Sequence, residues 1–155
     1  MPQANQTGYL AEAQTVAFSG AQNLNTLLVD EYTDLSDQID NSSSKYLQAD
    51  FELVVDLDVL TLNEGESLHL YIIPSVDGSN YPEWNGNTTT NTPTNESYYA
   101  GSFVARDQDA AQRLILEDIP LPAGVFKVGI RNKCSDDTAA SGHTLKWRPK
   151  SFGSQ

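Results

Sequence analysis

The strongest constraint on the fold is an alternation of apolar and polar residues between Leu47 and Val59. Every odd position in this stretch is apolar, and every even position except Val54 is polar. A period of two places the apolar set on one face of a β-strand, whereas a helix would spread it around the axis. The polar face carries four carboxylates and no cation: Asp50, Glu52, Asp56 and Asp58. The stretch therefore predicts a long strand with one buried and one wet face, in an antiparallel sheet. Because it is long, we expect it to bend or to pass between two sheets.

Other segments with strand character are shorter and are separated by turn residues. They are 15–18, 26–32, 67–73, 98–104, 113–116, 125–132 and 144–148. We expect 125–132 to pair with 113–116 as a hairpin across the turn at 121–124, and Pro149 to end the last strand. Residues 34–40 are compatible with a helical turn.

About eight short strands without a long helix predict an all-β chain folded as an antiparallel β-sandwich. A long polar loop at 79–95 and the mixture of short and long connections favour a jelly roll. An immunoglobulin-like sandwich is the alternative. We expect a single domain over residues 15–155, preceded by an N-terminal arm over residues 1–14 that stays mobile or packs on a partner.

The charge is strongly negative and unevenly distributed. The chain of 155 residues has a formal net charge of −12. Up to Phe126 there are 19 acids and three bases, whereas from Lys127 onward there are six bases and two acids. An acidic surface repels phosphate, which disfavours direct nucleic-acid binding. The basic end is expected to pair with acidic neighbours in the same fold or assembly.

Membrane and secretory signals are absent from the sequence. No apolar run approaches the length of a membrane span, and no basic residue followed by an apolar stretch opens the chain. Cys134 is the single cysteine, which excludes an internal disulfide and a cysteine metal cluster. These features predict a protein made in the cytoplasm, without a membrane partner.

The residues that most often support catalysis have no recognisable partners. His69 is expected on a solvated strand face, and His143 in a turn. Lys133 would lower the pKa of the Cys134 thiol, but without a nearby histidine we expect that thiol to be inert. Asp56 and Asp58 share a strand face, and residues 77–80 resemble part of a calcium loop without its later glutamate. We therefore expect no enzyme activity, catalytic residue, cofactor or metal.

Aromatic residues beside the polar loop are the best candidates for binding. Their rings could stack on sugars or anchor a protein contact, or they could simply cover the end of the sandwich. Together with apolar residues near the N-terminus, the candidate partner-binding residues are Tyr9, Leu10, Phe18, Tyr81, Trp84, Tyr98 and Tyr99.

Four blocks of the sequence resemble a family of small structural proteins from the head genes of tailed bacteriophages. The blocks are residues 28–36, 71–82, 121–127 and 144–149. The resemblance implies a capsid decoration (cement) protein, a β-sandwich that sits on the outer capsid surface of the virion. It implies assembly as a homo-oligomer, commonly a homotrimer, that clamps neighbouring subunits of the major capsid protein. It also implies synthesis in the host bacterial cytoplasm, and it carries no residue-level functional motif.

The alternative function is a tail-fibre or spike module that recognises host glycans through Tyr81, Trp84 and the polar loop. A receptor-binding tip normally needs a coiled-coil stalk or a partner domain. The sequence has neither repeats nor a coiled-coil stalk. This favours decoration over a fibre.

Overall fold

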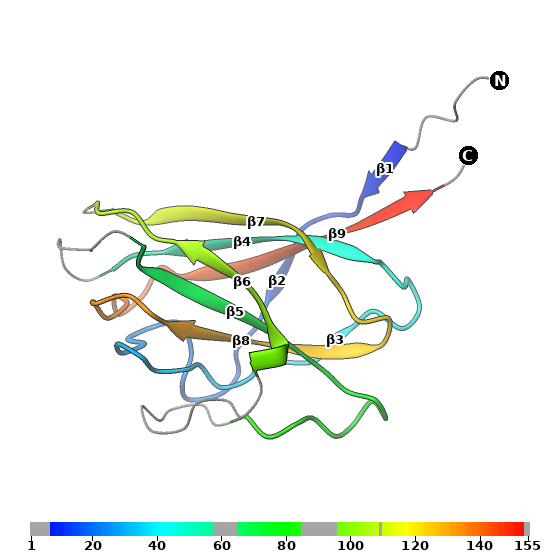
Figure 1. Cartoon of the computed structure of the whole chain (residues 1–155), viewed down its shortest axis with the longest axis horizontal. Helices are drawn as coiled ribbons and strands as arrows, with labels where there is room; N and C mark the ends of the chain where they lie inside the picture. Colours follow the sequence, from blue (N-terminus) through cyan, green and yellow to red (C-terminus); the bar gives the residue numbers. More distant parts are fainter. Residues whose placement is uncertain (1–6, 58–64, 85–95, 109, 154–155) are drawn as a thin grey trace.

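The chain forms two packed antiparallel sheets, as the sequence predicts. The computed structural model describes residues 7–57, 65–84, 96–108 and 110–153 (Figure 1). The first sheet has the order β1-β9-β4-β7, with β2 beside β9, and contains β1 (Thr7–Leu10), β2 (Gln14–Val16), β4 (Gln48–Val55), β7 (Gln112–Pro120) and β9 (Thr144–Gly153). The second sheet has the order β3-β8-β5-β6 and contains β3 (Ile39–Asp40), β5 (Ser67–Pro74), β6 (Tyr99–Val104) and β8 (Val125–Asn132). Within these ranges the only helix is the 3₁₀ turn η1 (Glu96–Tyr98).

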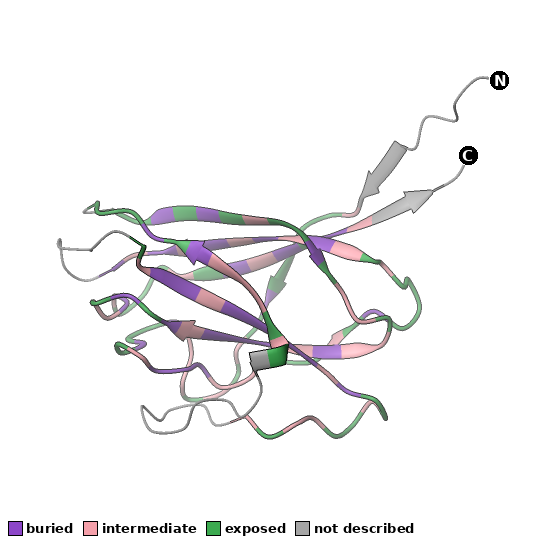
Figure 2. Cartoon of the chain, in the orientation of Figure 1, coloured by how far each residue is buried: buried purple, intermediate pink, exposed green. Residues whose placement is uncertain are grey.

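A single main core lies between the two sheets. The residues that form it include Phe51, Leu53, Leu70, Phe103, Phe126, Val128, Leu145 and Trp147. Figure 2 shows the buried residues alternating with exposed ones along β7, as a period of two requires. Both sheets therefore contribute one apolar face, and the prediction of a β-sandwich is confirmed.

The long alternating stretch forms β4, at the centre of the first sheet. Its odd positions from Ala49 to Val55 are buried and its even positions are partly exposed. The strand is shorter than predicted, because Leu47 is 65% exposed and regular pairing ends at Val55. Val59 lies outside the described residues. β4 pairs with β7 and β9 and so stays in one sheet, with a local irregularity near Ala49 where it pairs with β7.

Most connections between the described strands cross from one sheet to the other. In the described topology β5 and β6 are the only strands consecutive in the chain that pair with each other. This differs from an immunoglobulin sheet, in which the first two strands are neighbours. The jelly roll stays a prediction, and the strand order is compatible with it.

The expected hairpin between 113–116 and 125–132 is wrong. The first segment lies in β7 of the first sheet, whereas the second is β8 of the second sheet. The turn between them spans the end of the sandwich. The Leu121 N–H donates to Leu47 O beside the first sheet, and the Asn41 N–H donates to Gly124 O beside the second. A short turn can therefore change sheets as well as close a hairpin.

Residues 26–32 do not form a strand, and residues 34–40 do not form a helical turn. Instead, residues 30–39 lie beside β8 in an irregular pairing. Every third residue of this segment pairs with every second residue of β8. The paired residues are Asp30 with Asn132, Thr33 with Ile130, Ser36 with Val128, and Ile39 with Phe126. The Thr33 and Ser36 hydroxyls accept the N–H groups of Ile130 and Val128, so each replaces a backbone carbonyl. We call residues 30–36 the hydroxyl edge.

Pro149 does not end the last strand, because β9 continues through it to Gly153. Proline removes one backbone donor but keeps its carbonyl. The Pro149 carbonyl accepts the N–H of Ala11, and Pro149 lies opposite Ala49 in β4. The strand is therefore held on both sides at the position where it was expected to stop.

Candidate interaction surface

The outer face of the first sheet brings the acids of β4 next to the bases of β9. Asp50 lies opposite Arg148, and Glu52 lies opposite Lys146. On the other side of β4, Arg113 of β7 forms an ion pair with Glu52. Lys150 of β9 forms ion pairs with Asp50 and Asp118. The predicted pairing of the basic end with acidic neighbours in the same fold is thus confirmed. We call this surface the charged face.

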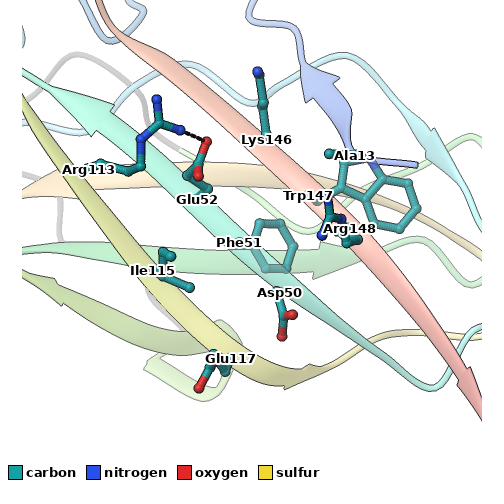
Figure 3. A pocket seen from close by; sticks show the side chains of 10 residues that line it. All are labelled: Ala13, Asp50, Phe51, Glu52, Arg113, Ile115, Glu117, Lys146, Trp147 and Arg148. Carbon is teal, nitrogen blue, oxygen red and sulfur yellow. Dashed lines mark hydrogen bonds and ion pairs between the residues drawn. The ribbon is translucent and has the colours of Figure 1, made fainter. Parts of the chain in front are cut away.

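The charged face contains a hollow of about 460 Å³ over β7, β4 and β9. Figure 3 shows the residues that line it, with the Arg113–Glu52 pair at one side and Lys146 and Arg148 along β9. Ile115 adds an apolar contact and is 56% exposed. Exposed bases, acids and one aliphatic side chain on a rigid sheet are suited to a polar protein–protein contact, in which charge complementarity selects orientation.

A β-bulge in β7 anchors one end of the charged face. Asp118 has a left-handed backbone conformation, with φ of 57°. Its N–H donates to the Asp50 carboxylate over 3.0 Å. Lys150 lies 2.5 Å from the same carboxylate and 2.8 Å from that of Asp118. Hydrogen bonds to Asp118 and Asp50 raise the pKa of the Lys150 ammonium above its ordinary value.

Replacing Lys150 with methionine should lower the free energy of unfolding by about 1 kcal/mol, because two partly exposed ion pairs are lost. Since the folded-state pKa of Lys150 is raised, this contribution is complete below the unfolded pKa and disappears as pH rises through the folded pKa. Denaturant titrations at pH 7, 9 and 11 would measure it, with Lys45→Met as the control in an exposed loop. A Lys150→Met effect that was already lost at pH 9, below the unfolded pKa, would contradict this assignment.

Aromatic side chains cover the outer face of the second sheet. Tyr32, Tyr71 and Ile73 are buried there, and Leu35, Tyr81, Trp84 and Tyr98 pack around them. The Trp84 Nε1–H donates to Thr33 O over 2.8 Å. Its indole contacts the rings of Tyr32 and Tyr71 at centroid distances of 5.4 and 5.5 Å. We call this group the aromatic cover.

Gly129 of β8 makes room for the indole of Trp84. A Cβ atom at this position would lie 2.2 Å from the nearest ring carbon of Trp84. A glycine in a strand interior often marks such a close approach. Gly129 is not among the binding residues predicted from the sequence, although a glycine between Val128 and Ile130 is a usable signal of a close approach.

Of the other aromatic candidates, Tyr81 and Phe18 make contacts within the chain, whereas Tyr99 is exposed to solvent. The Tyr81 hydroxyl donates to Gln38 Oε1 over 2.8 Å, and Lys127 Nζ lies 4.9 Å from the centre of the Tyr81 ring. Phe18 packs against the main core. Tyr99 is 43% exposed and makes an edge contact with His69.

The structure does not bring all the candidate binding residues together. Tyr81, Trp84 and Tyr98 belong to the aromatic cover, whereas Phe18 belongs to the main core. Tyr9 and Leu10 lie in β1, and their side chains are outside the described part of the chain, as is most of the loop at 79–95. The charged face was not predicted from the sequence, because it depends on which strands lie beside β4.

The thiol of Cys134 is less reactive than an ordinary cysteine. Burial raises its pKa to about 12, and the nearby carboxylates of Glu66 and Asp136 act in the same direction. Lys133 does not offset this rise, because its ammonium forms an ion pair with Asp30 instead.

His143 has a structural position between β4 and the loop before β9. Its Nδ1 accepts the N–H of Asp56, and its Nε2 lies 2.7 Å from Ala139 O. The ring therefore carries its proton on Nε2 and joins the two segments.

The carboxylate of Asp77 holds a local turn. It accepts hydrogen bonds from the backbone N–H groups of Ser79 and Asn80, which lower its pKa well below the usual range. Among the residues that the structure describes, no three His, Cys, Asp or Glu side chains are grouped closely enough to hold a metal ion. Asp58 is not among those residues.

No helix in the described ranges is long and apolar enough to cross a membrane. Comparison with protein-family models, with curated proteins and with solved structures found no match. The charged face and the arrangement of the strands are thus the observations on which a function can be proposed.

Proposed function

We propose that this protein is a non-enzymatic structural component of a bacteriophage virion that binds the outside of the assembled capsid. It stabilises the shell by clamping neighbouring subunits of the major capsid protein. The charged face is the observation that carries the proposal, and the resemblance to decoration proteins supplies the identity of the partner.

The charged face has the properties needed for a repeated, modest contact. Its bases and acids are held on three paired strands, so their spacing does not have to be created on binding. Arg148 is exposed, and the ion pairs of the face are at the surface. Such a contact is weak singly but adds up over a closed symmetric shell. If it forms only with the expanded lattice, binding stabilises that state by mass action.

The glycan alternative would use Tyr81 and Trp84 as stacking platforms. Both side chains are engaged within the chain, Trp84 with Thr33 and Gly129 and Tyr81 with Gln38. These contacts favour a role of both rings in the fold, and decoration is the function that we retain.

The location of the protein in the virion would test this proposal directly. Heads and tails would be separated, and the copies of this chain in each fraction would be counted by quantitative mass spectrometry. We expect hundreds of copies on heads, as a protein repeated over a symmetric shell requires. A handful of copies confined to tails would overturn the proposal and support the alternative.

A charge reversal would test the face that makes the contact. We expect Arg148→Glu to weaken binding to emptied, expanded capsids by about tenfold, with a smaller effect at high salt. Lys45→Glu makes the same charge change in the exposed loop after β3 and should bind normally. Equal affinities for Arg148→Glu and wild type would show that the charged face is not the contact. Thermal denaturation of both variants would verify that the fold is retained.

A further inference from the structure

The first strand and the tip of the last strand form a two-stranded ribbon that projects from the sandwich. Figure 1 shows β1 and the tip of β9 leaving the body together. β1 pairs with β9 from Thr7 opposite Gly153 to Leu10 opposite Lys150. The pairing of β9 with β4 ends at Lys150, opposite Gln48. Within the described part of the chain, residues 151–153 therefore pair only with β1, and we call β1 together with residues 151–153 the terminal ribbon.

Among the strands that the structure describes, none pairs with the outer edges of the terminal ribbon. β1 is the last strand on its side of the first sheet, and the tip of β9 has passed the end of β4. Open edges of this kind pair readily with another strand unless they are protected. Two other edges of the sandwich are protected, because the hydroxyl edge covers β8 and charged Arg113 and Glu117 lie on β7.

The ribbon also lacks the charges that normally keep strand edges apart. Residues 7–10 and 151–153 contain no Asp, Glu, Lys or Arg, although the whole chain has a net charge of −12. Two copies of an acidic body repel each other. A neutral ribbon that projects from the body lets two copies touch while their acidic bodies stay apart. A two-stranded ribbon alone is also marginally stable, so it gains from a further strand.

We infer that the terminal ribbon joins this chain to a second copy of itself through edge-to-edge strand pairing. The role of this oligomer rests on the proposed function, because an oligomer with several charged faces can bridge several capsid subunits. Its test uses the free protein, whereas the location test uses the virion, so the two can fail separately.

Charged substitutions in the ribbon would test the pairing. The molar mass of the full chain would be measured by size-exclusion chromatography with light scattering over a range of concentrations. We expect wild type to be an oligomer. We expect the oligomers of Tyr9→Asp and Phe152→Asp to dissociate into monomers at concentrations at least tenfold higher than the wild-type oligomer does. Val76→Asp adds the same charge at a fully exposed residue, 105% accessible, and should behave as wild type. Circular dichroism would show that the variants remain folded.

Cross-linking gives a second measurement that does not depend on the charged variants. Cys134 is buried, so an engineered cysteine would be the reactive thiol. We expect Thr7→Cys to form cross-linked multimers with a short bis-maleimide, and Val76→Cys to form none.

Two results would overturn the inference. One is a wild-type protein that is monomeric at every concentration and a Thr7→Cys variant that does not cross-link. The other is an oligomer unaffected by Tyr9→Asp and Phe152→Asp. A monomer whose binding to capsids is abolished by Tyr9→Asp would likewise overturn it, and would assign the ribbon to the shell.

Discussion

Replacing Trp84 with alanine is expected to lower the free energy of unfolding by about 3 kcal/mol. This is the typical cost of removing a large aromatic side chain that is mostly packed inside the protein. The variant loses the hydrogen bond from Nε1 to Thr33 O and the ring contacts with Tyr32 and Tyr71. Equilibrium denaturation in urea would measure the change. Trp84→Phe is the matched control, because it keeps a ring in the aromatic cover and loses the N–H donor, and it should cost less.

The contact between Trp84 and Gly129 makes this prediction specific. Gly129→Ala would place a Cβ 2.2 Å from the indole, so the ring must move and stability should fall. In the Trp84→Ala background the same substitution no longer meets the indole and should cost less. The two changes should therefore be strongly non-additive, as expected for residues in direct contact. Additive effects would show that the indole does not lie on Gly129.

The same variants address the glycan alternative. A Trp84→Ala protein that kept wild-type stability and lost binding to a glycan array would favour the tail-spike function. If the variant lost stability and the wild-type protein bound no glycan, Trp84 would be assigned a role in the fold only.

The second large effect is expected at the hydroxyl edge. Combining Thr33→Val with Ser36→Ala should lower the free energy of unfolding by about 3 kcal/mol, because two buried backbone N–H groups of β8 lose their acceptors. The amides of Ile130 and Val128 should then exchange with solvent faster than in wild type. Urea denaturation and amide hydrogen exchange would measure the two effects.

Thr33→Ser is the control for this pair of substitutions, because it keeps the hydroxyl and removes only a methyl group. It should preserve the slow exchange of the Ile130 amide. If Thr33→Ser and Thr33→Val accelerated that exchange equally, the hydroxyl would not be the acceptor. Such a result would mean that β8 is held by side-chain packing and by the backbone bonds from residues 30–36 alone.

Much of the architecture could be predicted from the sequence. The alternation along 47–59 correctly indicated a strand with one buried face, which the structure shows in β4. The turn chemistry and the absence of a long helical pattern indicated two antiparallel sheets. These features are visible in one dimension because burial of one face imposes a period of two on each strand.

The hydroxyl edge was missed because it does not have that period. Residues 26–32 are rich in apolar and β-branched side chains, which suggested a strand. Their neighbours instead pair with β8 every third residue, and Thr33 and Ser36 complete the pairing with side-chain oxygens. The composition of a segment does not indicate whether a side-chain hydroxyl or a backbone carbonyl will accept the N–H of the adjacent strand.

The charged face shows most clearly what each level decided. The sequence by itself determined that Asp50 and Glu52 share the wet side of a strand, and that the chain ends in bases. Only the tertiary structure placed β9 beside β4, with Arg148 opposite Asp50 and Lys146 opposite Glu52. Periodicity reports which side of a strand is buried, because that depends on the strand's own residues. The neighbour and the register of a strand depend on how the whole core packs, and so they emerge only when the two sheets close on each other.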